Sequence, residues 1–482
     1  MEHKQDWGDS ACPPKTPRIV GWVFGIVVFA LVAFMPGVFN DGDTFSHIAA
    51  GDWMLAHHAV PHADPFSYTK LGQPWVVHEW LSEILFAGAY RFLHWQGVVL
   101  LTAAAAGLAV AQLGRHLECF LAPGPVALLL VLTVACLSPS LLARPHVLAL
   151  PVFEAWAAAL FIARAEKRAP PWLLLPLMVL WANLHGGYML GLALLFPLGL
   201  EAIFAEPERW RPVLLRWGGF ALASVVAAAC TPAGLAGLLL PFKLTGVPEL
   251  SLVGEWQPTD FATLQPLELI LIAGLYLALS RGARLPPIRL LLILGLLHMA
   301  LRHTRHLVLI GLLFPLLIAE PLDASLQERK SAPVGAAWRV AAAGLACALL
   351  ALRLYLPLVR HDGPSAPMSA LAQVPAALAS THVLNDYSFG GYLIFNHMQP
   401  YIDGRVEVFG GDFLRRYRML TAPDVQTLRG ELQNWNVQWT LLSPGNPAAA
   451  VLDILPGWCR RYADPVAVIH VRCGEGKQAS HA

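Results

Sequence analysis

The stretch DGDTFSHIAAGDWM, residues 41–54, directly follows an apolar run over residues 19–38. That run is close to the roughly 20 residues that a transmembrane helix needs. The sequence therefore predicts a first transmembrane helix over 19–38, which ends just before two carboxylates, Asp41 and Asp43. The polar residues 1–18 are expected to form a cytoplasmic N-terminal tail.

Composition identifies the class of protein. The 482 residues are 56% hydrophobic and 13% charged, with a mean hydropathy of +0.54. Soluble domains carry about 25% charged residues, so the chain is expected to be an α-helical polytopic membrane protein. The formal net charge of +1 argues against a nucleic-acid partner, because nucleic-acid-binding surfaces are strongly basic.

Basic loops predict the topology, because cytoplasmic loops are enriched in Lys and Arg. The predicted cytoplasmic loops are residues 164–170, 206–217, 280–289 and 320–333. About eleven spans fit around them in a transmembrane domain over 19–358, with the N-terminus inside and the C-terminus outside. The predicted spans are 19–38, 97–113, 124–142, 146–163, 171–185, 188–204, 214–230, 264–280, 287–302, 306–320 and 336–358. A further span over 79–95 would break this alternation, so that segment should be an amphipathic helix within a large external loop over 39–96.

The chain changes character after a predicted linker over 359–375. Short strand-like runs alternate with a charged helical segment in residues 376–474, which predicts a small extracytoplasmic α/β domain. Cys459 and Cys473 flank an expected hairpin, and a disulfide bond and two free thiols are both compatible with the sequence. Residues 475–482 are expected to be a disordered tail.

Polar side chains recur at the outer ends of the predicted spans and in the first external loop. An ionisable group at membrane depth costs about 2.5–3.5 kcal/mol, so these groups should pair, line a cavity or bind a ligand. Arginine and histidine near the membrane surface suit a phosphate or pyrophosphate. The candidate substrate-binding residues are His47, His78, Glu79, Arg144, His146, Asn183, His185, Arg302, Arg305 and His306. Ion pairing between helices is the alternative for the arginines, and helix capping is the alternative for Asp43.

The predicted C-terminal domain contains three further candidates. Asp403 and Arg405 form an acid–base pair at a strand-end turn, and Asp386 could lie nearby. One interpretation is a structural salt bridge inside the small domain. The other is a surface that binds an acceptor, or forms a lid, above the membrane cavity.

Six segments carry a resemblance to a known superfamily: DGDTFSHIAAGDWML (41–55), PHADPFSYTKLGQPWVVHEWL (61–81), ARPHV (143–147), WANLHGGY (181–188), EWQPTDF (255–261) and the tail NDYSFGGYLIF…YIDGRVEVFG (385–410). Together they resemble a broad group of uncharacterised bacterial membrane proteins of the GT-C glycosyltransferase superfamily. Residues 79–117 also resemble the region after the first loop of protein O-mannosyltransferases and aminoarabinose transferases. The chain lacks the WWDYG-type acceptor motif of oligosaccharyltransferases.

The resemblance implies an enzyme that uses a polyprenyl-phosphate or polyprenyl-pyrophosphate sugar as its donor. It implies that Asp43, or secondly Asp41, is the general base, and that a second acidic residue, Glu255 or Glu79, contributes a carboxylate from another external loop. It also allows a divalent cation (Mg, Mn or Zn), for which His47 and His62 are candidate ligands.

The expected function is therefore inverting transfer of a sugar to a protein, lipid or glycan acceptor of the cell envelope. The reaction would take place on the extracytoplasmic side of the bacterial inner membrane, with Asp43 as the base. Two alternatives stay open at this point. One is a transporter or flippase of a lipid-linked saccharide, a class that commonly shows inverted repeats; the other is a non-catalytic membrane scaffold.

Overall fold

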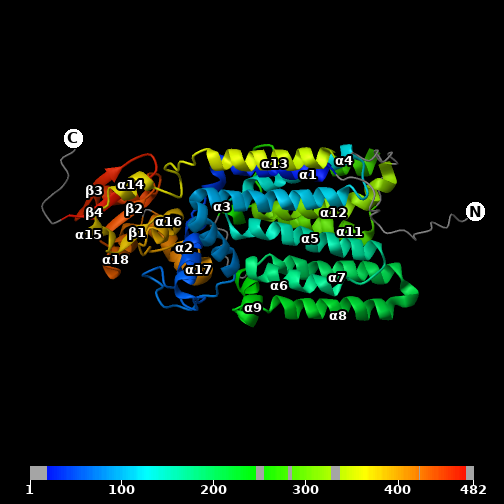
Figure 1. Ribbon diagram of the computed structural model, residues 1–482. Helices are drawn as coiled ribbons and strands as arrows, with labels where there is room; N and C mark the ends of the chain where they lie inside the picture. Colours follow the sequence, from blue (N-terminus) through cyan, green and yellow to red (C-terminus); the bar gives the residue numbers. More distant parts are fainter. Residues whose placement is uncertain (1–18, 246–253, 281–284, 327–336, 423, 474–482) are drawn as a thin grey trace, which may run out of the picture.

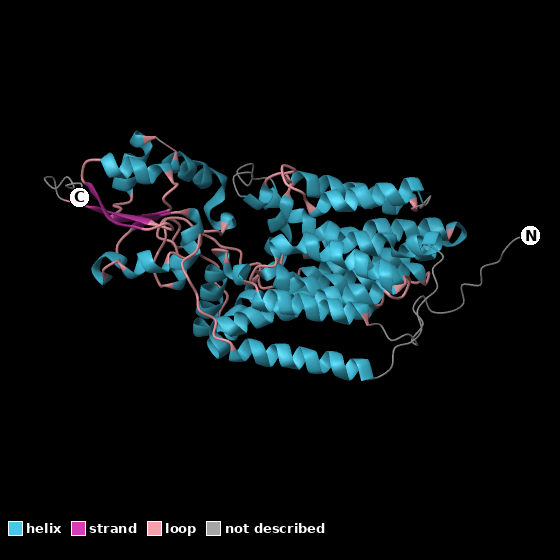
Figure 2. Cartoon of the chain, turned by 90° about the horizontal axis from the view of Figure 1, so that it is seen from above, coloured by secondary structure: helices cyan, strands magenta, loops and turns pink. Residues whose placement is uncertain are grey.

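The computed structural model describes residues 19–245, 254–280, 285–326, 337–422 and 424–473. The predicted tails, 1–18 and 475–482, lie outside the described residues. The molecule is elongated, with a helical bundle at one end and a smaller part that contains the strands at the other (Figure 1). Figure 2 shows the same division from above, with every drawn strand at the end away from the bundle.

Every range that was predicted as a span contains a helix of this bundle. The helices are α1 (Val20–Phe34), α3 (Trp80–Leu117), α4 (Pro123–Leu137), α5 (Pro145–Ala165), α6 (Leu175–Leu184), α7 (Tyr188–Ala205), α8 (Trp210–Ala228), α10 (Pro266–Ser280), α11 (Pro287–Arg302), α12 (Leu307–Leu326) and α13 (Ala337–Tyr355). A further short helix, α9 (Gly234–Thr245), was not predicted.

The described residues include six helices that are long and apolar enough to cross a membrane. They are Trp80–Leu117, Pro123–Ser140, Pro145–Ala165, Tyr188–Ala205, Thr304–Asp323 and Ala337–Tyr355. The protein is therefore a multi-pass membrane protein, but the predicted count of about eleven spans is not confirmed. The reason is physical, because α1, α6 and α10 are apolar but shorter than a full membrane crossing.

Helix α3 is broken at Leu93 and His94, whose backbone angles are not helical. The break divides an outer segment from the part that runs through the bundle (Figure 1). It lies where the sequence analysis placed the change from an amphipathic helix to a span. The outer segment packs against α2 (Asp43–His57), which begins at the carboxylate pair.

The C-terminal part contains a small mixed sheet of four strands in the order β1-β2-β4-β3. Strand β1 (Val383–Asn385) runs parallel to β2 (Trp439–Leu442), and β4 (Val468–Arg472) is antiparallel to β2 and to β3 (Trp458–Ala463). The accompanying helices are α14 (Met368–Ala372), α15 (Ala376–Ala379), α16 (Gly390–Phe395), α17 (Val406–Thr421), α18 (Val425–Asn434) and α19 (Pro447–Ile454). A disulfide bond joins Cys459 and Cys473, so the structure favours the first of the two alternatives left open by the sequence.

The C-terminal part packs directly on the start of α2. A Cβ atom on Gly391 would lie 2.0 Å from the carbonyl oxygen of Gly42, so only glycine permits this approach of the two backbones. Phe45 of α2 is buried in one hydrophobic core with residues of the C-terminal part, such as Leu393. The C-terminal part is therefore fixed to the segment that carries Asp41 and Asp43.

Candidate functional site

The turn between α1 and α2 determines how the two carboxylates point. Asp41 accepts a hydrogen bond from the backbone N–H of Asp43 through Oδ1, at 2.7 Å. Asp41 therefore satisfies a free N–H at the start of α2, as capping residues do. The alternative that Asp43 itself caps the helix is wrong, because Gly42 is the N-cap residue and Asp43 is the first helical residue.

Arg144, which lies at the N-cap of α5, brings three carboxylates together. Its Nη2 donates to Asp43 Oδ2 at 2.6 Å, and its Nη1 donates to Glu255 Oε2 at 3.0 Å. The same Nη1 lies 3.2 Å from Asp41 Oδ2. Three segments that are distant in the sequence, those of the aspartate pair, Arg144 and Glu255, therefore meet at one guanidinium.

Arg305 completes this group from the turn between α11 and α12. Its Nη1 donates to Glu255 Oε1 at 3.2 Å, so the two oxygens of Glu255 each accept from a different arginine. The Arg305 guanidinium also lies 4.4 Å from the ring centroid of Trp256, a cation–π distance. The result is a chain of charges that alternate in sign across the end of the bundle that faces the C-terminal part.

These charged groups line a cavity of about 500 Å³ between the bundle and the C-terminal part. The lining from the bundle side includes Asp41, Asp43, Arg144, His146, Glu255, Trp256 and Arg305. The lining from the C-terminal side includes Pro364, Ser365, Tyr387, Ser388, Gly404 and Val406. The cavity therefore has an ionic wall and a wall made mainly of small and backbone groups.

Gly404 touches the central carboxylate. A Cβ atom on Gly404 would lie 1.8 Å from Asp43 Oδ1, so the glycine leaves room for that oxygen. The hydroxyl of Tyr387 donates to the carbonyl oxygen of Gly404 at 3.3 Å, which holds the loop in this position. Asp43 is thus enclosed by Arg144 on one side and by the loop of Gly404 on the other.

The environment of Asp43 suits a general base. Burial raises the pKa of Asp43 to about 6, although Arg144 acts in the opposite direction; the negative neighbours Asp41 and Glu255 add to the rise. A carboxyl group with a pKa near the working pH can both accept and release a proton. For Glu255, by contrast, the two arginines outweigh burial and hold its pKa below the ordinary value.

A second cluster of ionisable groups lies outside the cavity lining and is centred on Glu79. The Nε2 atoms of His185, His78 and His47 lie 3.4, 3.6 and 3.9 Å from its carboxylate oxygens. His47 Nδ1 lies 3.1 Å from Glu83 Oε1. These four candidates were predicted to bind substrate, but the structure uses them to join α2, the start of α3 and the end of α6.

The charges of the second cluster explain why its members stay together. Burial would lower the pKa of His47, but the hydrogen bond to Glu83 and the charge of Glu79 raise it to about 9. Burial would raise the pKa of Glu79, but His78, His185 and His47 lower it to about 2. Glu83 was missed by the sequence analysis, although it lies four residues after Glu79 on the same helix face.

The expected metal site does not fit the structure. His47 is engaged by Glu79 and Glu83, whereas His62 is exposed on a loop, so the two residues share no site. Over the described ranges, no group of three or more His, Cys, Asp or Glu side chains is arranged to hold a metal ion. In the cavity the reason is that Arg144 occupies the space between the carboxylates.

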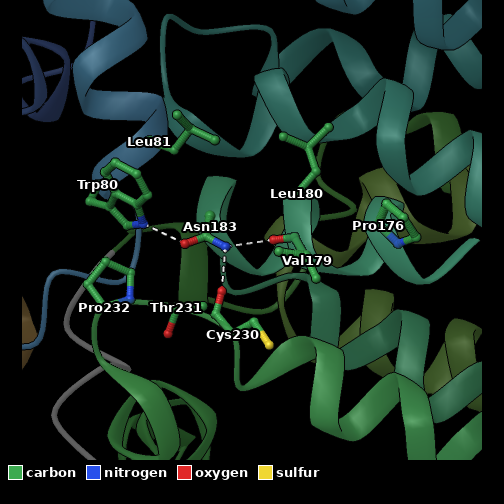
Figure 3. Close-up of a pocket in the computed structure, with 9 residues that line it drawn as sticks. All are labelled: Trp80, Leu81, Pro176, Val179, Leu180, Asn183, Cys230, Thr231 and Pro232. Carbon is green, nitrogen blue, oxygen red and sulfur yellow. Dashed lines mark hydrogen bonds between the residues drawn. The ribbon is translucent and has the colours of Figure 1, made fainter.

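Three other candidates do not line the cavity. The amide of Asn183 accepts from Trp80 Nε1 and donates to the carbonyl oxygens of Val179 and Cys230, and it lines a separate pocket of about 540 Å³ (Figure 3). Arg302 is exposed at the end of α11. His306 lies with Nδ1 3.1 Å from the carbonyl oxygen of Met299. These three residues therefore lie outside the lining of this cavity, and their role in substrate binding stays a prediction.

The acid–base pair of the C-terminal part is structural. Arg405 donates to Asp403 Oδ2 at 2.6 Å and to Asp64 Oδ1 at 2.7 Å, and all three residues are buried. Asp386 accepts from the backbone N–H and the hydroxyl of Ser443. The segment from Asp403 to Arg405 contributes to the cavity through the backbone of Gly404 instead. The sequence gives no sign of this contact, because no side chain makes it.

Comparison with known proteins identifies the fold. Neither a protein-family model nor a curated protein matches the sequence. One similar solved structure is the archaeal oligosaccharyltransferase AglB from Archaeoglobus fulgidus, in complex with an inhibitory peptide and a dolichol-phosphate. The match covers 94% of this chain and 74% of the AglB chain. The TM-score is 0.51 and the sequence identity 9%. A second is the apo form of an oligosaccharyltransferase from the same archaeon. That match covers 87% of this chain and 69% of the archaeal chain, with 11% sequence identity and a TM-score of 0.46. The protein therefore has the GT-C fold, as the resemblance of its sequence motifs predicted.

Proposed function

We propose that the protein is a glycosyltransferase that moves a sugar from a polyprenyl-phosphate or polyprenyl-pyrophosphate donor to an acceptor on the extracytoplasmic side. The observation that carries the proposal is the placement of Asp43 beside Arg144, with Arg305 close by, in one cavity at the outer end of the bundle. A base and a phosphate-binding pair are the two functions that such a transfer needs.

Each charged group has a definite role in the proposed reaction. Asp43 accepts the proton of the acceptor hydroxyl, whose oxygen then bonds to the anomeric carbon of the sugar. The bond from that carbon to the phosphate oxygen breaks, and the configuration inverts. Arg144 and Arg305 stabilise the negative charge that develops on the leaving phosphate.

The positions of the arginines support an anionic ligand. Arg144 precedes α5, and Arg305 lies in the one-turn helix that leads into α12. The N-terminal ends of helices carry partial positive charge and bind anions readily. In the solved complex, AglB holds a dolichol-phosphate, which supports a lipid phosphate as the ligand of the same fold here.

The membrane assignment belongs to the same proposal. With the N-terminus in the cytoplasm, the cavity and the disulfide-bonded C-terminal part face the periplasm or the cell exterior, where disulfides persist. We propose the bacterial inner membrane as the location. The acceptor class, whether protein, lipid or glycan, is the part to be determined by experiment.

The test is the substitution Asp43→Asn in purified protein reconstituted into proteoliposomes. We expect sugar transfer from a polyprenyl-phosphate donor to fall by about 10²–10⁴-fold, the range for removal of a general base. The matched control is Asp52→Asn on the same helix, because the Asp52 side chain is 47% exposed and pairs with Arg91 at the surface. Transfer that persists at the wild-type rate in the Asp43 variant would contradict the proposal.

A further inference from the structure

Glu255 occupies the position that a bound anion would take between the two arginines. Its Oε2 accepts from Arg144 at 3.0 Å and its Oε1 accepts from Arg305 at 3.2 Å. Arginines also hold a phosphate in this way, with two guanidinium groups that each donate to a different oxygen of the anion. The carboxylate of Glu255 thus makes the two contacts that a phosphate between these arginines would make.

The charges of the cavity prevent Glu255 and a phosphate from binding to the two arginines at the same time. Three carboxylates, Asp41, Asp43 and Glu255, face only two guanidinium groups. The phosphodiester of a polyprenyl-phosphate sugar would add a further negative charge, and the phosphate monoester that leaves would add about −1.5 to −2. Like charges at such short distances repel strongly where burial reduces the effective dielectric constant. One carboxylate therefore has to leave the arginines before a phosphate can bind.

Glu255 is the carboxylate that can leave with the least disturbance. Its side chain is 34% exposed, compared with 23% for Asp43 and 12% for Asp41. Asp41 is also held by its bond to the α2 backbone, and Asp43 by the short bond to Arg144 Nη2. A rotation of the Glu255 side chain toward water would break only its two bonds to arginine.

The backbone beside Glu255 provides a fixed pivot for this rotation. The carbonyl oxygen of Glu255 accepts from the Thr304 hydroxyl at 3.1 Å. The backbone N–H of Thr304 donates to the carbonyl oxygen of Gln257, also at 3.1 Å. Both bonds join the segment of Glu255 to the turn that carries Arg305, so the exchange requires a movement of one side chain only.

From these observations we infer that Glu255 is the resident occupant of the phosphate site and exchanges with the phosphate of the donor. Its carboxylate keeps Arg144 and Arg305 in position while the site is free of ligand. The inference rests on the proposed function and assigns Glu255 to control of donor affinity, in place of the catalytic role predicted from the sequence.

The test compares the affinity of three forms of the full chain for undecaprenyl phosphate in detergent at fixed ionic strength. They are the wild type, Glu255→Gln and the control Asp260→Asn, which removes the same charge from an exposed residue of the same loop. We expect Glu255→Gln to lower the Kd by about tenfold, because a competing charge is lost while the shape is kept. Asp260→Asn should leave the Kd within about twofold of the wild type, because simple surface charges are screened.

Further measurements separate the possible outcomes. Uncharged undecaprenol should bind all three forms equally, and Arg305→Gln should weaken the binding of undecaprenyl phosphate. If the wild type binds in an Arg305-dependent manner but Glu255→Gln binds equally or more weakly, the inference is overturned and the proposed function stands. If neither the wild type nor Glu255→Gln binds undecaprenyl phosphate, the proposed donor class fails and the inference fails with it. In the transfer assay, a lower donor KM with kcat retained supports the inference, whereas a loss of kcat at unchanged KM would restore the catalytic role.

Discussion

Gly404→Ala is expected to slow sugar transfer strongly, although the substitution replaces no ionisable residue. The added Cβ would lie 1.8 Å from Asp43 Oδ1 and 2.7 Å from its Cγ. Carbon and oxygen atoms that are not bonded lie about 3.5 Å apart, so the carboxylate or the loop has to move by more than about 1 Å. Among the described glycines, Gly404 is not one with a positive φ, so the effect is steric and not a backbone strain.

The expected magnitude follows from this displacement. A shift of about 1 Å in a reacting group can reduce the rate by about 10²-fold. Overpacking of this kind costs about 1–3 kcal/mol in the free energy of unfolding. The rate is measured as sugar transfer in proteoliposomes, and the stability is measured by thermal unfolding of the purified protein.

A matched glycine in the same part of the chain provides the control. Gly430 in α18 has no heavy atom within 4 Å of an added Cβ, so Gly430→Ala should retain the rate. It should also stabilise the helix by about 0.5–1 kcal/mol. Wild-type transfer and stability in Gly404→Ala would show that Asp43 and the loop of Gly404 are not in contact, and would refute the reasoning.

Three further predictions concern charged groups of the cavity and of the buried ion pair in the C-terminal part. The transfer rate should rise with pH through about 6, because Asp43 acts as a base only when it is deprotonated and its pKa is raised to about 6. Asp41→Asn removes a negative neighbour, lowers the pKa of Asp43, and should move this limb of the pH–rate profile to lower pH; a limb that stays in place would contradict the assignment of Asp43. Arg405→Gln should lower the free energy of unfolding by about 3–5 kcal/mol, because Asp64 and Asp403 would be left as buried, unpaired carboxylates. A loss below about 1 kcal/mol in chemical denaturation would show that the pair is not structural.

Hydrophobic pattern and loop charge predicted the membrane part well. The position of a helix in the sequence depends on local composition, which is why each predicted span contains a helix. The same pattern does not determine whether a short helix crosses the bilayer, so the number of spans is not confirmed. Topology predicted an amphipathic helix over 79–95 and a separate span over 97–113, because an additional crossing would have reversed every later loop, and α3 is broken close to that boundary, at Leu93 and His94.

The site was predicted in its residue types but not in its pairings. The sequence placed Asp43, Arg144, Glu255 and Arg305 on one side of the membrane, and the structure brings them into contact. Whether Arg302 or Arg305 points into the cavity depends on how the chain rotates through the one-turn helix between α11 and α12. No local sequence pattern determines that rotation. Contacts made by backbone, such as that of Gly404 with Asp43, leave no side-chain signal.

The histidine cluster shows the same limit for tertiary pairing. His47 lies four residues after Asp43 and was predicted to bind substrate. Its actual partners, Glu79 and Glu83, lie on the next helix, and the charges of the three groups satisfy one another. Sequence spacing within a helix cannot reveal which neighbouring helix supplies the opposite charge.

The most direct test of the central claim is a cryo-EM structure of the full chain with undecaprenyl phosphate. We predict phosphate density between Arg144 and Arg305, with the Glu255 side chain turned away and Asp43 still beside Arg144. Bound lipid phosphate elsewhere in the molecule, with Glu255 still joined to both arginines, would contradict a phosphate site in this cavity and the transferase function built on it.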